Sequence, residues 1–189
     1  MKCMFKQLCL PILALLVLGF SSCSSTKHID IENDALESKY NTSLDLWNKQ
    51  KAENGGNYKY STSYASVFGY RSRTEITVKN NKVVGRKFYE TEQGSQDLKL
   101  VFEEDESTIN SVPDRGTAVT MDQIYETCGE TSLTKDEYYD AGEGEKIEAN
   151  VLTFETDVKG ILSNCGYREA MCADDCYRGT YIADFKWLK

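Results

Sequence analysis

The first 23 residues determine how much of this chain can fold and in which compartment it folds. Lys2 and Lys6 precede an apolar run of about eleven residues from Leu10 to Phe20, and small polar residues follow, which is the order typical of a secretory signal. The run lies within the roughly 7–15 residues of a signal's apolar segment and falls short of the roughly 20 that span a bilayer. We therefore expect residues 1–22 to be removed during export.

The end of this signal, Phe20-Ser21-Ser22-Cys23, resembles a bacterial lipobox, in which small residues precede a cysteine that becomes the lipidated N-terminus. Acyl chains on Cys23 would hold the mature protein on a bacterial membrane, facing the periplasm or the cell surface. Residues 23–33 then form a polar tether. The alternative is an ordinary signal cleavage that leaves Cys23 as a free thiol.

The remaining residues, 34–189, suit one domain with its own core better than two domains. The whole chain carries a formal net charge of −8, and removal of the two signal lysines makes the mature protein more acidic. Nucleic acids and anionic lipids bind proteins through lysine and arginine, so the negative net charge argues against both as partners. The acyl anchor is then the only membrane contact that we expect.

A helix is the first element that the spacing of apolar residues predicts. It covers residues 34–51, with Asn33 or Asp34 as its cap, and Asn54-Gly55-Gly56 ends it. Alternating residues then predict strands over 58–68, 70–79, 82–90 and 96–102, with Asn80-Asn81 as the tight turn between the second and third. The acidic and polar stretch 103–116 is interpreted as a surface loop.

A second cycle of helix and strands follows. Thr120 is a plausible cap for a helix through Met121, Ile124, Tyr125 and Cys128. Strands are predicted over 147–156, 160–167 and 180–188, with a turn at 157–159. This order predicts an α+β domain in which both helices pack on one face of a single antiparallel sheet.

Four short motifs follow one another along the mature chain: Trp47 in the first helix, the strand start Tyr58-Lys59-Tyr60, the hairpin from Val78 to Val84, and the helix start from Thr120 to Tyr125. Together they resemble a family of uncharacterised bacterial lipoproteins that carry a domain of unknown function. The resemblance covers residues 36–187. It implies export and this architecture, and it implies no activity or site residues.

Cysteines are the strongest chemical signal in the domain, which holds Cys128, Cys165, Cys172 and Cys176. An even number in an exported protein predicts two disulfides, for which three connectivities are possible. We favour Cys128 with Cys165 and Cys172 with Cys176, and crossed pairings stay open. A zinc site is the alternative, but the spacing lacks the two close pairs of zinc ribbons, so no metal or other cofactor is expected.

Catalytic chemistry finds little support in the residue types. His28, the single histidine, lies in the predicted tether, which excludes hydrolases and metal sites that depend on histidine. An acid and base pair could be drawn from Glu103, Glu104, Asp105, Glu106, Glu155, Asp174 and Asp175. We interpret the run 103–106 as solvated loop and predict no catalytic residue. The segment 136–145 offers oxygen ligands but misses the spacing of a calcium-binding EF-hand loop.

A non-enzymatic binding or accessory module of the cell envelope is the function that these features favour. Its partner would be a protein, a peptide or a glycan, and the candidate contact residues are Tyr58, Tyr60, Tyr64, Tyr70 and Trp187. Tyrosine is also common in half-buried strands, which is the competing explanation for these residues. Two other classes stay open: a carboxylate-dependent hydrolase of an envelope polymer, and a secreted enzyme inhibitor.

Overall fold

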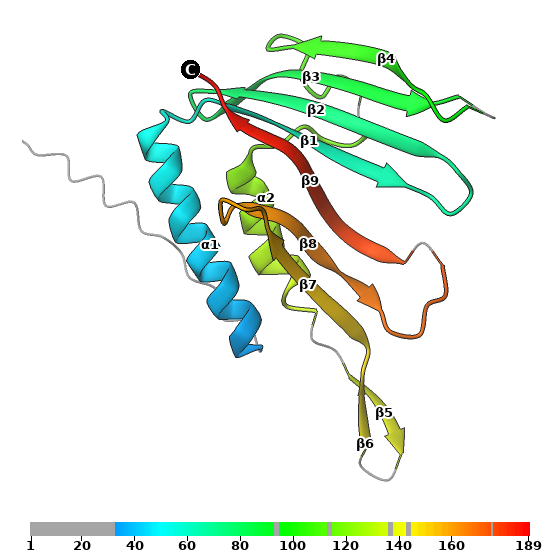
Figure 1. Ribbon diagram of the computed structural model, residues 1–189. Helices are drawn as coiled ribbons and strands as arrows, with labels where there is room; N and C mark the ends of the chain where they lie inside the picture. The colour runs from blue at the N-terminus through cyan, green and yellow to red at the C-terminus, as the bar shows by residue number, and fades with distance from the viewer. Residues whose placement is uncertain (1–32, 93–94, 113–114, 136–137, 143–144, 175) are drawn as a thin grey trace, which may run out of the picture.

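The computed structural model of this protein describes residues 33–92, 95–112, 115–135, 138–142, 145–174 and 176–189. It contains the helices α1 (Asp34–Glu53) and α2 (Met121–Thr127) and the main strands β1 (Tyr58–Ala65), β2 (Arg71–Lys79), β3 (Lys82–Thr91), β4 (Leu98–Asp105), β7 (Asn150–Thr156), β8 (Leu162–Glu169) and β9 (Tyr177–Trp187). These strands form one antiparallel sheet in the order β4-β3-β2-β1-β9-β8-β7. Both helices lie on the same side of it, which we call the inner face (Figure 1). The α+β architecture is confirmed.

Helix α1 begins where its cap predicts. The Asn33 side chain accepts a hydrogen bond from the Leu36 amide at 3.2 Å, which satisfies one of the unpaired donors of the first turn. The helix ends at Glu53, and Gly55 and Gly56 follow with positive φ angles of 65° and 68°. Tyr40, Ser43 and Trp47 form the face that the helix buries against the sheet.

The first three strands form the predicted meander. Asn80 and Asn81 join β2 to β3 with φ angles of 49° and 61°, the left-handed backbone that a two-residue hairpin turn requires. Strand β1 is shorter than predicted and ends at Ala65, because a turn in which the Ser66 amide donates to the Tyr70 carbonyl begins directly after it.

The interpretation of residues 103–105 as solvated loop is wrong. Strand β4 continues to Asp105, and Glu104 pairs in register with Arg86 of β3 on the inner face, where Glu104 is only 4 % exposed. Alternate residues of a strand face opposite sides of the sheet, so an acidic run can bury every second residue where a cation on the neighbouring strand and further hydrogen bonds satisfy the charge.

Helix α2 has the capping box that Thr120 suggests. The Thr120 hydroxyl accepts from the Gln123 amide, and the Gln123 side chain accepts from the Thr120 amide. A π-helical turn, η2 (Cys128–Ser132), continues the helix, and β5 (Tyr138–Gly142) and β6 (Glu145–Glu148) then form a separate two-stranded hairpin. The prediction of a single sheet is therefore wrong in this segment, and the strand expected from residue 147 begins at Asn150 as β7.

Strand β9 joins the two halves, because it lies between β1 and β8 in the sheet. Helix α1 crosses to the second half, where Lys39 donates to the Phe154 carbonyl of β7 at 2.8 Å and the Tyr40 ring lies 5.6 Å from the Phe154 ring. Residues of both helices and of strands from both halves share one apolar core. The two cycles of helix and strands thus pack as one unit (Figure 1).

Candidate functional site

A groove lies on the inner face beside helix α2. The paired strands β1 and β2 extend past α2 toward the hairpin that joins them, so this end of the sheet carries no helix (Figure 1). A cavity of about 280 Å³ opens here between the sheet, the segment 115–119 and Ile124 of α2. We call it the inner-face groove.

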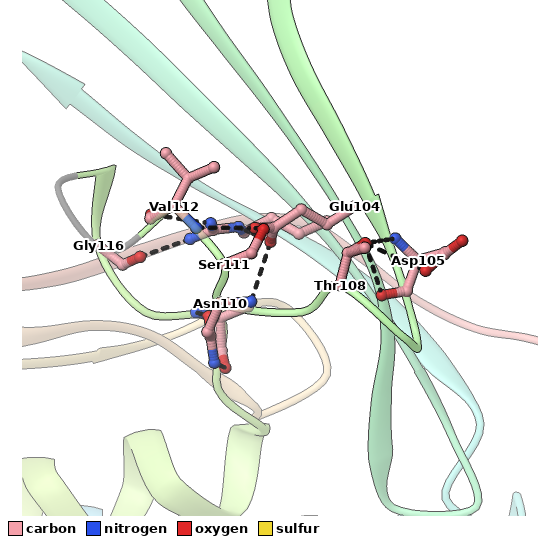
Figure 2. A network of polar contacts seen from close by, with 9 residues as sticks. Glu104, Asp105, Thr108, Asn110, Ser111, Val112 and Gly116 are labelled. Atoms are coloured by element: carbon pink, nitrogen blue, oxygen red, sulfur yellow. Dashed lines mark hydrogen bonds and ion pairs between the residues drawn. The ribbon is translucent and has the colours of Figure 1, made fainter.

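One wall of the inner-face groove is held by the buried pair of Arg86 and Glu104. The Arg86 Nε donates to Glu104 Oε2 at 2.7 Å, and its other nitrogens donate to the carbonyls of Val112 and Gly116. Figure 2 shows how the Glu104 carboxylate faces the returning chain, where it accepts from Ser111 Oγ at 2.9 Å and from the Val112 amide at 3.1 Å. The wall is therefore fixed to the sheet by charge-assisted hydrogen bonds.

The same network keeps Glu104 ionised. Burial raises the pKa of this carboxyl, but hydrogen bonds from Arg86, Ser111 and the Asn110 amide outweigh burial and lower the pKa to about 2. A carboxylate held in this state cannot serve as a general acid near neutral pH. Glu104, which the sequence offers as a catalytic candidate, is a structural anion.

Threonine hydroxyls line the floor of the inner-face groove. Thr62 of β1 and Thr74 of β2 are directly opposed in register, and Thr180 of β9 lies beside them on the same face. All three are half-buried. Within the part of the chain that the structure describes, none of the three hydroxyls makes a hydrogen bond to another residue. Each can donate and accept, so the floor offers unused hydrogen-bonding capacity to a ligand.

Two tyrosines stand at the hairpin end of the groove. Tyr64 lines the cavity with 52 % of its surface exposed, and its ring centroid lies 6.1 Å from that of Tyr70. The Tyr70 hydroxyl donates to Glu90 at 3.0 Å, and Arg115 forms an ion pair with the same carboxylate at 2.9 Å. The charge of Arg115 at the groove is thereby balanced.

Tyr58 and Tyr60 are buried, which favours the competing explanation for these two tyrosines, that they belong to the core. They are 0 % and 2 % exposed. The Tyr58 hydroxyl accepts from the Met121 amide at the start of α2, and the Tyr60 hydroxyl donates to the Val119 carbonyl. Both hydroxyls fix α2 on the sheet, and the helix covers the rings. Tyr64 and Tyr70 are accessible.

Trp187 belongs mainly to the packing of α1. Its ring stacks on Trp47 with the centroids 5.3 Å apart, and its Nε1 donates to Gln50 at 3.3 Å. The side chain is half-buried and lies outside the inner-face groove.

The cysteines are paired as favoured from the sequence. Cys128 is bonded to Cys165, which ties the end of α2 to β8, and Cys172 is bonded to Cys176 before β9. Both disulfides are compatible with an exported protein. This pairing leaves none of the four thiolates to bind zinc, and no group of three or more histidine, cysteine, aspartate or glutamate residues within the described ranges gathers around a metal-sized site.

The remaining acidic candidates do not converge on the inner-face groove. Glu103 is exposed and forms an ion pair with Lys87 at 3.1 Å, and Asp105 accepts from Ser107 and Thr108 in the turn after β4. Glu155 accepts from Asn164, and Asp174 is exposed. Glu106 is also exposed. Asp175 and part of the 136–145 segment lie outside the described residues.

Cys23 and His28 also lie outside the described residues. In the described ranges, no helix combines the length and the apolar character needed to cross a membrane. The groove itself gave no signal in the sequence, because its floor combines the consecutive strands β1 and β2 with β9, which is distant along the chain. Comparison of the chain with protein-family models, curated proteins and solved structures finds no match in any of the three.

Proposed function

We propose that this chain is an exported protein, anchored by lipid at Cys23, whose domain is a non-enzymatic binding module for an uncharged glycan. The observation that carries the proposal is the inner-face groove, where three threonine hydroxyls that have no partner among the described residues lie next to the exposed ring of Tyr64. Sugars display hydroxyl groups at the ring edge and C–H bonds on the ring face, which match these two kinds of side chain.

Charge supports an uncharged ligand. Arg115 is the accessible cation at the groove, and Glu90 neutralises it at 2.9 Å, while Arg86 is neutralised by the buried Glu104. A charged ligand group placed in the groove would lose water without gaining an unpaired counter-charge.

Size supports a polymer over a small metabolite. The cavity of about 280 Å³ lies near the lower end of the roughly 300–1,000 Å³ typical of pockets that enclose drug-sized ligands. One unit of a chain fits this volume, and the rest of the chain would run along the open end of the sheet.

The decisive experiment is an NMR titration of the full mature chain with uncharged oligosaccharides prepared from bacterial envelope polymers. We expect saturable shifts at Thr62, Thr74 and Thr180. Replacing two hydroxyls in Thr62→Val/Thr74→Val removes two hydrogen bonds of about 0.5–1.5 kcal/mol each, so affinity should fall about tenfold or more.

Thr77→Val is the matched control, because Thr77 lies on the same strand as Thr74 and faces the opposite side of the sheet. It should leave the affinity unchanged. If no oligosaccharide binds, or if both sets of variants lose affinity equally, the groove is not a glycan site.

Lipid anchoring is tested separately by mass spectrometry of the protein extracted from its own membranes. Cleavage before Cys23 with an acyl increment supports it, and Cys23→Ser should release the protein from the membrane fraction. An unmodified mass at residue 23 would contradict the anchor while leaving the glycan proposal open.

A second candidate, an inhibitor that inserts a loop into an enzyme cleft, has one observation in its favour. Phe68 is 88 % exposed at the tip of the β1–β2 hairpin, in a turn closed by hydrogen bonds from the Ser66 amide to Tyr70 and from the Gly69 amide to Ser66. A rigid apolar tip of this kind can fill an apolar pocket. A stoichiometric complex with an enzyme that Phe68→Ala abolishes and Thr62→Val/Thr74→Val preserves would select this candidate.

A further inference from the structure

The outer face of the sheet, opposite the helices, holds a second cavity of about 180 Å³. Small residues of three neighbouring strands form its floor: Ser61 of β1, Thr77 of β2 and Gly85 of β3. Longer charged side chains stand around this floor. We call this cavity the outer-face pocket.

The three acids around the outer-face pocket, Glu75, Glu103 and Asp184, each form an ion pair. Arg73 forms ion pairs with Glu75 at 3.1 Å and with Asp184 at 2.9 Å, and Lys87 forms an ion pair with Glu103 at 3.1 Å. Asp184 also accepts a hydrogen bond from Ser61 at 3.0 Å. Glu75 and Asp184 share Arg73, so these three acids face two cations and also offset one further positive charge.

Two further lysines stand at the pocket. Lys59 of β1 and Lys186 of β9 are directly opposed in register, and both are exposed and line the pocket. Within the described part of the chain, neither side chain forms an ion pair. Like charges directly opposite each other on neighbouring strands destabilise a sheet. The four cations around this cavity, Lys59, Arg73, Lys87 and Lys186, outnumber the three acids Glu75, Glu103 and Asp184, so the cavity is net positive by one charge in a chain whose net charge is −8.

Arg73 adds unused hydrogen-bonding capacity at the same place. Its two ion pairs both use Nη2, and its Nε is buried without a hydrogen-bond partner. A buried donor without an acceptor is costly, so a rotation of the Arg73 side chain that turns Nε toward a ligand acceptor would remove this cost.

A second pair of opposed lysines in the same sheet lies away from the cavity and serves as a comparison. Lys79 and Lys82 are also directly opposed and exposed, but they flank the Asn80–Asn81 turn and line no part of the outer-face pocket. The two pairs share charge and register and differ in the presence of a cavity.

We propose that the outer-face pocket binds an oxyanion, the phosphate or carboxylate group of a small polar molecule, between Lys59 and Lys186 and beside Arg73. Lysine ammonium groups and an arginine fork are the side chains that recognise such groups. The site lies on the opposite side of the sheet from the inner-face groove and is independent of the glycan proposal.

The test is a titration of the isotope-labelled, full mature chain with inorganic phosphate and, separately, with acetate, followed by NMR. We expect saturable shifts at residues 59, 61, 77, 85 and 186. The variant Lys59→Gln/Lys186→Gln should bind at least tenfold more weakly, and Lys79→Gln/Lys82→Gln should bind as the unchanged protein does. Saturation by phosphate alone, by acetate alone or by both supports the site and identifies the oxyanion.

Thermal unfolding provides a second readout that does not depend on signal assignment. Without ligand, Lys59→Gln/Lys186→Gln should have the higher Tm, because the repulsion is gone. Phosphate should raise the Tm of the unchanged protein and not that of this variant. Shifts that sodium chloride reproduces at equal ionic strength, or equal losses in the two lysine variants, would overturn the proposal.

Discussion

Arg86 Nε and Glu104 Oε2 lie 2.7 Å apart between β3 and β4, and the two side chains are 0 % and 3 % exposed. The pair joins the sheet to the returning segment 110–116, because each partner also bonds the backbone of that segment. Burying two charges is favourable only when their hydrogen bonds are satisfied, and here the segment that walls the inner-face groove satisfies them.

Removing one partner should therefore cost much more than removing an exposed ion pair. We expect Glu104→Gln to lower the free energy of unfolding by about 3–5 kcal/mol, because it leaves the Arg86 charge buried without a counter-charge. Glu103→Gln is the matched control, one residue away on the other face, where the pair with Lys87 is exposed and little change is expected. Urea unfolding monitored by circular dichroism compares the two. Equal losses would mean that burial of the first pair does not matter.

Acid should weaken the unchanged protein through the same residue. The folded-state pKa of Glu104 is lowered to about 2, whereas an unperturbed glutamate titrates near 4.3. The stabilisation is thus complete above about pH 4.3 and is lost as pH falls toward about 2. The difference in unfolding free energy between the unchanged protein and Glu104→Gln should shrink over this range. A difference that stays constant between pH 5 and pH 2 would argue against a lowered pKa.

The helix starts and the first hairpin could be predicted because their signals are local. The side chains of Asn33 and Thr120 each accept a hydrogen bond from an amide only three residues later. Asn80 and Asn81 alone determine the turn between β2 and β3. The favoured cysteine pairing is also confirmed.

The sites could not be predicted because they depend on residues far apart in the chain. Glu104 is buried by Arg86, 18 residues earlier, and Tyr58 is covered by the helix whose Met121 amide, 63 residues later, donates to its hydroxyl. The inner-face groove needs β9 beside β1, a neighbour relation that no spacing in the sequence reveals. Alternation predicts which residues share a face and does not tell which face a helix will cover.

The two disulfides should contribute unequally to stability. They close segments with sequence separations of 37 and 4 residues. In the chain-entropy model the longer loop gives about 4 kcal/mol and the shorter about 2 kcal/mol. We expect Cys128→Ala/Cys165→Ala to lower the free energy of unfolding about twice as much as Cys172→Ala/Cys176→Ala, as measured in urea. Equal losses would show that the Cys128–Cys165 bond acts through native contacts and not through loop closure.

Alkaline pH should unfold the domain through its buried tyrosines. Burial raises the pKa of Tyr40 and of Tyr125 to about 12, and burial also raises that of Tyr58 and of Tyr60. Their stabilisation is complete below about pH 10, the unfolded value, and is lost as pH rises through the folded-state values.

Tyrosinate absorbance recorded together with circular dichroism tests this expectation. Exposed tyrosines should ionise first, and the buried ones only as secondary structure is lost. Tyr125→Phe should leave the first phase unchanged and should reduce the second, because burial raises the pKa of Tyr125. A single phase near pH 10 with intact secondary structure would show that the buried hydroxyls reach solvent.

Gly166 of β8 and Gly179 of β9 are directly opposed, and both are needed for the approach of these strands. A Cβ at Gly166 would lie 2.4 Å from the Arg178 carbonyl oxygen and 2.6 Å from the Gly179 Cα, and the Tyr177 hydroxyl is 2.7 Å away. Backbone atoms cannot yield as a side chain can, so β8 and β9 would have to separate. We expect Gly166→Ala and Gly179→Ala each to lower the free energy of unfolding by about 1–3 kcal/mol.

Gly85→Ala is the matched control for this pair of glycines, because Gly85 lies in the same sheet with room for a methyl group. The nearest atom to its added Cβ, the Glu104 carbonyl oxygen, is 3.7 Å away. Alanine at a compatible glycine position restricts the unfolded chain, so this variant should be neutral or more stable by about 0.4–1 kcal/mol. Urea unfolding of the three variants, with amide spectra of β8 and β9, gives the comparison. Equal stability of all three would mean that the separation of β8 and β9 adjusts without cost and that the glycine pair does not set it.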